Sequence, residues 1–384
     1  DAVHPVITDR QFRTWRSYAV SAWPTLAAID PEGYVVGAHA GEFTVEMLTP
    51  FIDGLIETAR AKGVLNTEPV QFSADAPTME ARLLRYPGKV AVDGDRVAIA
   101  DSGNNRVIVG RIGDDPSSMR IEHTVGGEAG FEDGASGQFK YPQGLAFAGD
   151  LLHVADAGNH AIRTIDLRHG SVRTLAGTGN QMRTRADLKA GAMSSPWDVA
   201  LVGQVLYVAM AGTHQIWTVK ASDGQSRVHS GVGGEDIRDG DHQSALLAQP
   251  MGITAMSGRI FFADAESSAI RWADADELGA VGTIVGTGLF DFGDVDGTAD
   301  DVRLQHPQGI ASHPDGRLLV ADSYNDCIKL VNPETRSSTT WIRELNEPGG
   351  IACNATHAYI ADTNAHRIVV AELTTGATQE LSLE

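Results

Sequence analysis

Six copies of one short pattern occupy most of this chain, and their regular spacing limits the fold more than any other feature. Each copy holds an apolar run that usually ends in Asp, as in VAIAD and LLVAD. The residues at this Asp position are Asp101, Asp156, Met210, Asp264, Asp322 and Asp362, with spacings of 55, 54, 54, 58 and 40. A proline column keeps nearly the same period, at Pro87, Pro142, Pro196, Pro250, Pro307 and Pro348. Two columns with one period indicate a repeat protein.

Each repeat predicts four short antiparallel strands. One strand follows the proline, a second ends at the Asp position, a third alternates in polarity after a polar turn, and a fourth ends in a Gly-rich step. Four such strands at a period of about 40–55 residues are typical of a β-propeller blade. A single blade cannot bury both of its faces, so the six must pack around an axis. The predicted fold class is therefore mainly β, a six-bladed β-propeller.

The repeats also resemble a known family. The pattern Pro-x-Gly-[Ile/Leu]-Ala followed by Val-Ala-Asp-x-x-Asn is similar to the NHL repeat, and residues 141–167 and 306–331 match it nearly throughout. The resemblance extends from Tyr86 to the end of the chain. Strings such as SPWDV at 195–199 and LQHPQGI at 304–310 resemble NHL-repeat proteins that place a thioredoxin-like domain before a six-bladed propeller.

Residues 1–68 have a different pattern. We expect a helix at 9–18, strands at 22–30 and 34–39, and a helix at 45–61. This order, with Trp-Pro-Thr opening the first strand, resembles the C-terminal half of a thioredoxin fold. The resemblance implies that Pro24 is a cis-proline, an unusual and retained feature. The expected domains are a partial thioredoxin-like domain (1–68), a linker (69–85) and the propeller (86–384).

Thioredoxin chemistry is not expected from this chain by itself. The resemblance would require an earlier Cys-x-x-Cys unit, and no cysteine precedes Cys327. Thiol–disulfide exchange needs a thiolate nucleophile and a resolving thiol. We therefore expect no catalytic residue in 1–68. Thiol–disulfide or peroxide-related activity is expected only of an intact parent that carries the missing half.

Charge and cysteine content restrict the partners. The chain has 30 Lys and Arg against 50 Asp and Glu, a net charge of −20, which argues against nucleic-acid binding. No apolar run approaches the length of a transmembrane helix, so we expect no membrane partner. Only two cysteines, Cys327 and Cys353, are present, which favours a reducing, cytoplasmic setting. We expect a monomer that binds protein partners and needs no cofactor.

The residues that follow the column prolines form the candidate binding site. The innermost strand of a blade begins at the rim of the central channel, so these side chains should surround its mouth. They are Lys89, Gln143, Trp197, Asp198, Met251 and Gln308. The set suits either a Lys89–Asp198 contact across the rim or a ligand or peptide site. Four positions of the same column, Gly144, Gly252, Gly309 and Gly350, would permit close backbone approach or a positive φ.

Three other patterns raise the question of a metal site. The Asp column supplies five carboxylates, and the position four residues later carries Asn105, His160, His214, Ser268, Asp326 and His366. Imidazole suits Zn, Cu or Fe, but these residues lie on different blades. The segment DFGDVDG at 291–297 lacks the spacing of an EF-hand. We favour local hydrogen bonding in each case and expect no metal.

Two classes of function stay open. We favour a protein-binding or scaffolding propeller attached to a redox domain. The alternative is a propeller hydrolase or lyase with a channel-bound metal, as in some six-bladed relatives. That activity would require His, Asp or Glu side chains that converge on the axis, where the mouth column offers only Asp198.

Overall fold

The chain forms two compact units, Asp1–Glu80 and Ala81–Glu384. A computed structural model describes residues 9, 13–20, 24–41, 44–68, 82–135 and 137–384. The described part of the first unit contains α1 (Arg13–Ser17), the antiparallel strands β1 (Thr25–Ile29) and β2 (Val35–Ala40), and α2 (Val45–Lys62). The order of elements predicted for residues 1–68 is therefore observed.

Local sequence explains the ends of α2. The helix begins after Thr44, whose hydroxyl accepts a hydrogen bond from the Met47 N–H, and it ends at Gly63 in the left-handed region (φ 69°). A helix–hairpin–helix order is shared by many α/β units, so the thioredoxin-like fold stays a prediction. The predicted cis bond joins Pro24 to Trp23, which lies outside the described residues.

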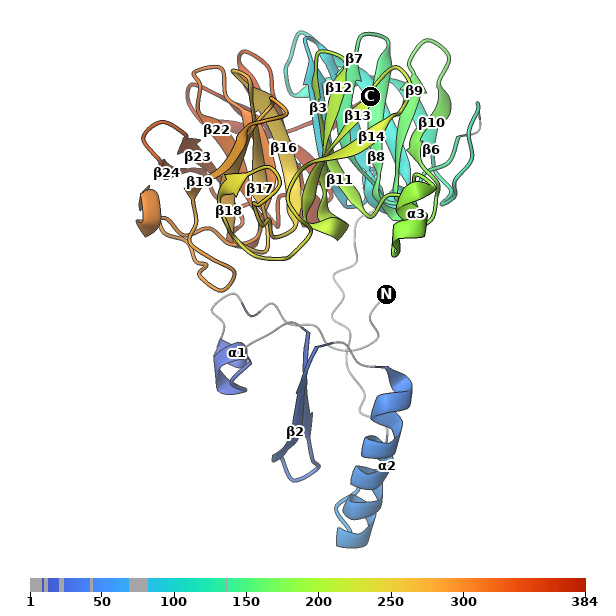
Figure 1. Ribbon diagram of the computed structural model, residues 1–384, viewed down its shortest axis with the longest axis vertical. Coiled ribbons are helices and arrows are strands. Elements are labelled where there is room, and N and C mark those ends of the chain that lie inside the picture. Colours follow the sequence, from blue (N-terminus) through green and yellow to red (C-terminus); the bar gives the residue numbers. More distant parts are fainter. Residues whose placement is uncertain (1–8, 10–12, 21–23, 42–43, 69–81, 136) are drawn as a thin grey trace. The chain divides into compact units, whose positions relative to one another are not determined.

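The second unit is the predicted six-bladed β-propeller (Figure 1). Each blade has four antiparallel strands in chain order from the channel outward. Blade 1 has β3 (Pro87–Asp93), β4 (Arg96–Asp101), β5 (Arg106–Ile112) and β6 (Ser118–Gly126); blade 2 has β7 (Pro142–Ala148), β8 (Leu151–Asp156), β9 (Ala161–Asp166) and β10 (Ser171–Gly177); blade 3 has β11 (Pro196–Val202), β12 (Val205–Met210), β13 (Gln215–Lys220) and β14 (Ser226–Ser230). Blade 4 has β16 (Pro250–Met256), β17 (Arg259–Asp264), β18 (Ala269–Asp274) and β19 (Ala280–Val285); blade 5 has β21 (Pro307–Ser312), β22 (Leu318–Asp322), β23 (Cys327–Asn332) and β24 (Ser337–Ile342); blade 6 has β25 (Gly350–Cys353), β26 (His357–Asp362), β27 (Arg367–Glu372) and β28 (Thr378–Glu380).

The ring closes at its inner and outer circumference. The innermost strands contact one another in order, and β25 of blade 6 contacts β3 of blade 1. At the outside, β29 (Ser382–Leu383) pairs in parallel with β6 of blade 1. Two further short strands, β15 (Gly240–Asp241) and β20 (Gly297–Thr298), cover the outer edges of blades 4 and 5. Added strands of this kind protect a sheet edge from pairing with another chain.

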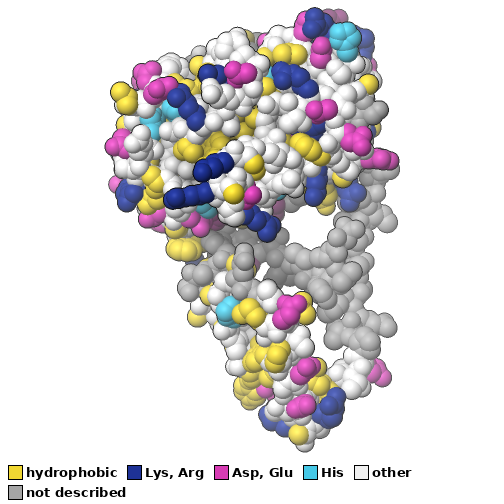
Figure 2. Space-filling view, turned by 45° about the vertical axis from the view of Figure 1, so that its right-hand side comes forward, with side chains coloured by type: hydrophobic (Ala, Val, Ile, Leu, Met, Phe, Trp, Pro, Cys, Tyr) yellow, Lys and Arg dark blue, Asp and Glu magenta, His cyan; other side chains and the backbone are white. Residues whose placement is uncertain are grey.

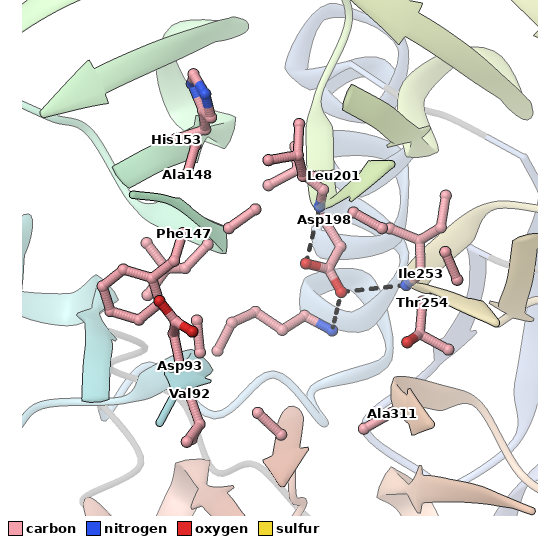
Figure 3. A pocket seen from close by; sticks show the side chains of 18 of the residues that line it. Val92, Asp93, Phe147, Ala148, His153, Asp198, Leu201, Ile253, Thr254 and Ala311 are labelled. Atoms are coloured by element: carbon pink, nitrogen blue, oxygen red, sulfur yellow. Dashed lines mark hydrogen bonds and ion pairs between the residues drawn. The ribbon is translucent and has the colours of Figure 1, made fainter. Parts of the chain in front are cut away.

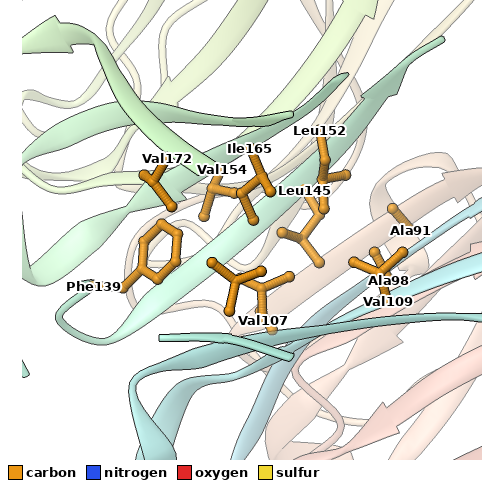
Figure 4. Close-up of a cluster of buried hydrophobic side chains, with 12 residues drawn as sticks. Ala91, Ala98, Val107, Val109, Phe139, Leu145, Leu152, Val154, Ile165 and Val172 are labelled. Atoms are coloured by element: carbon orange, nitrogen blue, oxygen red, sulfur yellow. The ribbon is translucent and has the colours of Figure 1, made fainter. Parts of the chain in front are cut away.

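Apolar side chains fill the space between neighbouring blades. Between blades 1 and 2, Val107 and Val109 face Leu145, Leu152 and Val154 in a cluster of fully or nearly fully buried residues (Figure 4). Equivalent clusters lie between the other blades. Each blade therefore buries its two faces only through its neighbours, as the repeat pattern predicted.

A hydrogen bond between neighbouring blades repeats six times. A short 3₁₀ turn or bend follows the second strand of each blade and ends at a residue with φ between 49° and 55°. The side chain of this residue accepts a hydrogen bond from the backbone N–H that precedes the column proline of the next blade. The acceptors are Asn105, His160, His214, Ser268, Asp326 and His366, and the donors are Tyr141, Ser195, Gln249, His306, Glu347 and Tyr86, at 2.9–3.2 Å. The three histidines are therefore acceptors in the scaffold, on three separate blades.

The Asp column has a different repeated role. In five blades the Asp Oδ1 accepts the backbone N–H two residues before the column proline of the same blade, as from Arg85 to Asp101 at 2.7 Å. Oδ2 meets an Arg in four of them: Arg106, Arg163, Arg271 and Arg367. The predicted local role of the Asp column is therefore observed.

Close approach between innermost strands explains the glycine column. A Cβ on Gly144 would lie 2.4 Å from the Cα of Asp198, and one on Gly252 would lie 2.7 Å from the Gln308 carbonyl oxygen. Gly309 and Gly350 face the same restriction. None of the four has a positive φ. Of the two roles considered for this column, close approach is the observed one.

This crowding predicts the effect of a single methyl group. Gly144→Ala should lower the free energy of unfolding by about 1–3 kcal/mol, because the β11 backbone would have to move. Urea unfolding measures the change. Gly288→Ala is the matched control, since its Cβ meets nothing within 4 Å, and it should change stability by less than about 0.5 kcal/mol. Equal stability of the two variants would contradict the proposed constraint.

Candidate binding face and central channel

The propeller has two different faces. We call the loop face the one formed by the residues just before each column proline and by the turns after the Asp column. The opposite side, formed by the tight turns between strands such as Gly149–Asp150 and Gly203–Gln204, is the turn face. The innermost strands run from the loop face to the turn face.

A buried ion pair lies where the channel meets the loop face. Lys89 on β3 is 3% exposed, and its Nζ lies 3.6 Å from Oδ2 of Asp198 on β11 (Figure 3). The Lys89 ammonium also donates to the Gln308 carbonyl. Asp198 accepts the backbone N–H groups of Val199 and Ile253 at 2.9 and 3.1 Å. The contact links blades 1, 3, 4 and 5 across the channel.

Burial perturbs both charges of this pair. Removal from water lowers the pKa of Lys89 and raises the pKa of Asp198, while the attraction between the two groups opposes each shift. The two backbone N–H donors also favour the ionised carboxylate. The Lys89–Asp198 contact that the sequence analysis considered is therefore present, in the interior of the protein.

The other predicted mouth residues are only partly accessible. Gln143 is buried and donates to the Ser102 hydroxyl at 3.3 Å. Met251 is buried in a small cluster with Ala211 and Ala265, against which the half-buried Trp197 packs. Gln308 is half-buried. The sequence interpretation placed all six side chains on an open mouth, but four of them lie in the interior because the innermost strands converge so closely.

A cavity of about 1130 Å³ occupies the channel beyond the ion pair. Apolar side chains such as Val92, Phe147 and Leu201 line it together with polar ones such as Asp93 and Thr254, and its accessible lining is more polar than apolar (Figure 3). Residues of the turn face, including Gly149 and Gly203, also line it. The cavity therefore belongs to the turn-face half of the channel.

His153 is the one fully buried histidine ring beside this cavity in the described chain. Its Nδ1 lies 3.0 Å from the Thr164 hydroxyl, and its Nε2 has no hydrogen-bond partner. Burial, with a smaller effect of Arg173, lowers the pKa of His153 to about 4. The imidazole is therefore neutral at pH 7.

Neither cysteine is activated. Cys327 is buried and Cys353 half-buried, and both are free thiols. Burial raises the pKa of Cys353 to about 11 and also raises the pKa of Cys327. The Cys353 thiol donates to the Ser312 carbonyl at 3.1 Å. Both groups are therefore protonated at neutral pH and are poor nucleophiles.

The Asp-rich segment 291–297 binds a lysine. Among the described residues, one group of three potential metal ligands gathers, formed by Asp294, Asp322 and Cys327. The Lys329 ammonium contacts Asp294 and, at 2.9 Å, Asp296. A cation of the chain thus neutralises the carboxylates at this point.

Aromatic side chains that the sequence analysis did not single out occupy the loop face. Tyr86 and Tyr141, which directly precede column prolines, are 37% and 42% exposed, and Tyr324 is 44% exposed. The rings of Tyr141 and Trp197 meet edge to face with centroids 6.2 Å apart. The sequence offered one signal for Tyr86 and Tyr141, which is their position: a residue just before a column proline lies on this rim in every blade.

Charge is mixed over the visible propeller surface. Figure 2 shows Lys and Arg side chains interspersed with Asp and Glu, without one continuous basic patch on this side. Among the described residues, no helix combines the length and apolar character needed to cross a membrane.

Comparison with known proteins agrees with this architecture. The NHL repeat family matches residues 84–109 and 304–329. NHL repeat-containing protein 2 is 35% identical in Gallus gallus and 34% identical in Homo sapiens, over 97% of this chain and 58% of each relative. Protein SUPPRESSOR OF QUENCHING 1, chloroplastic, of Arabidopsis thaliana is 34% identical over 99% of this chain and 39% of that protein. The chain thus spans less than two thirds of the length of these relatives.

Solved structures with low sequence identity show the same fold. A chain in a crystal structure of the nidogen/laminin complex has a TM-score of 0.51 at 15% identity. The match covers 73% of the present chain and 89% of the chain from that complex. A streptogramin B lyase structure has a TM-score of 0.50 at 12% identity. The match covers 79% of the present chain and 85% of the lyase chain. At such identities the likeness concerns the fold alone.

The neutral His153 predicts an acid-dependent loss of stability. Because its pKa falls from 6.5 to about 4 on folding, the unfolded chain takes up this proton first as the pH drops, and stability is lost between these values. At pH 5 the loss should be about 2 kcal/mol relative to pH 8. Urea unfolding of the wild type and of His153→Leu at both pH values measures it.

Comparison with His153→Leu separates the contribution of this histidine to the pH dependence of stability from that of other groups. Asp156 and Asp322, whose pKa values burial raises to about 6 and about 7, titrate in both proteins and cancel in the comparison. The wild type should therefore lose about 2 kcal/mol more than His153→Leu. Equal losses in the two proteins would show that His153 titrates normally.

Proposed function

Because this chain belongs to the NHL-repeat proteins and is homologous to NHL repeat-containing protein 2, we propose that its propeller is a protein-binding platform. The loop face is the contact surface. The observation that carries this proposal is the pair of exposed rings at Tyr86 and Tyr141, with the half-buried Trp197 beside Tyr141, around a closed channel rim. Aromatic side chains on a rigid, solid surface are typical anchors of protein interfaces.

The residues that line the channel give less support to an enzymatic function. A lyase or hydrolase with a channel-bound metal would need converging ligands at the axis. Among the described residues, Asp198 is occupied by Lys89 and two backbone N–H groups, and the group of three potential ligands lies in blade 5, beside Lys329. We therefore do not propose the metal-dependent alternative.

The first unit supplies the redox part of the proposal. We propose that it is thioredoxin-like, because Trp-Pro-Thr at 23–25 carries that resemblance and the helix–hairpin–helix order is compatible with it. In a longer protein with a Cys-x-x-Cys unit before residue 1, the propeller would bring a bound partner to the redox unit. Scaffolding of thiol–disulfide chemistry is therefore the proposed role of the intact parent.

A photo-crosslinking residue tests the loop face. Placed at Tyr141, it should form discrete adducts with a protein partner in the native host, whereas the same residue at the exposed Asp150 on the turn face should not. Trp197→Ala should reduce the Tyr141 adducts, because loss of an anchor residue costs about 1–3 kcal/mol of affinity. Adducts from Asp150 alone, or from neither site, would contradict the proposal.

Thermal unfolding of the same variant separates two roles of Trp197. If its ring is an anchor, Trp197→Ala should lose partner affinity while its melting temperature stays close to that of the wild type. If its ring is core, stability should fall while affinity in the folded fraction is kept, and the loop face would then be excluded as the site.

The thiols give a second test. Residues 1–384 should not reduce insulin disulfides with dithiothreitol, because no thiol lies in 1–68 and the propeller thiols are protonated. With a pKa of about 11, Cys353 should react with iodoacetamide about 100-fold more slowly than an ordinary thiol at pH 7.5. Urea-unfolded protein is the control and should react normally. Insulin reduction that disappears in Cys353→Ser would place the chemistry on the propeller.

A further inference from the structure

The residues just before the column prolines and in the turns after the Asp column carry cations on one side of the loop face and carboxylates on the other, whereas the longer loops carry both signs, with Glu128 and Glu132 on the basic side. The first side, which we call the basic sector, lies on blades 1 to 3 and contains Arg85, Tyr86, Lys140, Tyr141 and Trp197. The second, the acidic sector, lies on blades 4 to 6 and contains Glu235, Glu266, His306, Tyr324 and Glu347. Since six blades form a closed ring, blades 1 and 2 lie across the axis from blades 4 and 5.

The two cations of the basic sector occupy equivalent positions in their blades. Arg85 and Lys140 each stand two residues before a column proline, and their side chains pass directly over Gly103 and Gly158 of the adjoining turns. Both are exposed, and among the described residues neither has a carboxylate within ion-pair distance. Tyr86 and Tyr141 lie beside them. The sector therefore offers two unpaired cations next to accessible rings.

The acidic sector has the opposite composition. The carboxylates of Glu266 and Glu347 both lie close enough to Tyr324 to raise the pKa of its phenol, after the larger effect of burial. Burial, and then the charge of Glu235, raises the pKa of Glu266. His306 stacks on Tyr324 with centroids 4.5 Å apart. Its own pKa is lowered to about 4 by burial, so it does not neutralise Glu266, 3.8 Å away, at pH 7.

Arg85 and Lys140 lack the carboxylate partners that buried cations elsewhere in the described chain have. Arg163 and Arg271, for example, each meet two carboxylates. We propose that the loop face binds an extended polypeptide segment with an acidic end over the basic sector and a basic end over the acidic sector. This inference rests on the proposed protein-binding function and adds the chemistry and direction of the partner.

The arrangement favours such a segment over other occupants. A nucleic acid would meet repulsion over the acidic sector, since its charge is uniformly negative. A small ion would not reach both sectors. A polypeptide can carry both charges and can place apolar or aromatic side chains on the central rings.

Peptide binding tests the proposal on the full chain. The probe is a fluorescein-labelled peptide with four Glu at one end, four Lys at the other and a Gly-Pro-rich spacer of about eight residues. At low ionic strength and pH 8, fluorescence anisotropy should show at least about tenfold tighter binding than for a peptide of the same composition with alternating Glu and Lys. Equal affinity for the two peptides would overturn the proposal.

Charge variants locate the binding. Lys140→Glu and Glu266→Lys should each weaken binding of the separated peptide at least about fivefold, and Glu235→Lys, at an exposed position, serves as a second acidic-sector variant. The double variant Lys140→Glu/Glu266→Lys should recover binding, because the peptide can bind in the reverse direction. Lys220→Glu and Glu334→Lys, on turn-face loops, are the matched controls and should have no effect.

The outcomes separate this inference from the function on which it rests. If the sector variants behave like the turn-face controls, or if the double variant does not recover, the two-sector inference is wrong. Tyr141 adducts that persist in that case would leave the protein-binding function in place. Loss of both results would exclude the loop face altogether.

Discussion

The convergence of the six innermost strands determines what this propeller can do. At four of the six positions after the column prolines only glycine fits, because the neighbouring backbone lies within contact distance of the missing Cβ. At the two remaining positions stand Lys89 and Asp198, and their charges meet in the narrowed channel. The loop face therefore has a solid centre, and the channel cavity belongs to the other half of the molecule. The loop face and the channel cavity are thus physically separate.

The repeat also shows how buried charges are either paired or replaced by apolar side chains. In blades 2 and 4, an Arg seven residues after the column Asp pairs with that Asp in the interior. Blade 3 has Met210 at the Asp position and Trp217 at the Arg position, and both side chains pack in one apolar cluster. A lone buried charge is costly, so both partners are replaced together. In blade 5, Lys329 binds Asp294 and Asp296 instead, which explains the Asp-rich loop without a metal ion.

Sequence predicted the parts of the structure that repeat. Two columns with one period were sufficient to predict the number of blades, the four strands of each blade and the local role of the Asp column. Position along the strand also identified Lys89 and Asp198 as neighbours across the channel. Their burial was not predictable, because it depends on how closely six separate strands approach one another. Tyr86 and Tyr141 were missed for a related reason: the residue before the proline varies among Tyr, Ser, Gln, His and Glu, and its exposure follows from the ring rather than from its own repeat.

The basic sector and the inter-blade hydrogen bonds depend on each other. His160 and His366 accept backbone N–H groups through Nδ1, so a proton on that nitrogen would remove the acceptor. Burial first, and then nearby cations, lower the pKa of both rings: Lys140 and Arg183 act on His160, and Arg82 and Arg85 act on His366. Two of these cations, Lys140 and Arg85, belong to the basic sector, so the cations proposed to meet a partner also help to keep two inter-blade hydrogen bonds intact at neutral pH. An acidic segment bound over them would offset part of this effect, which couples occupation of the loop face to the contacts between blades 2 and 3 and between blades 6 and 1.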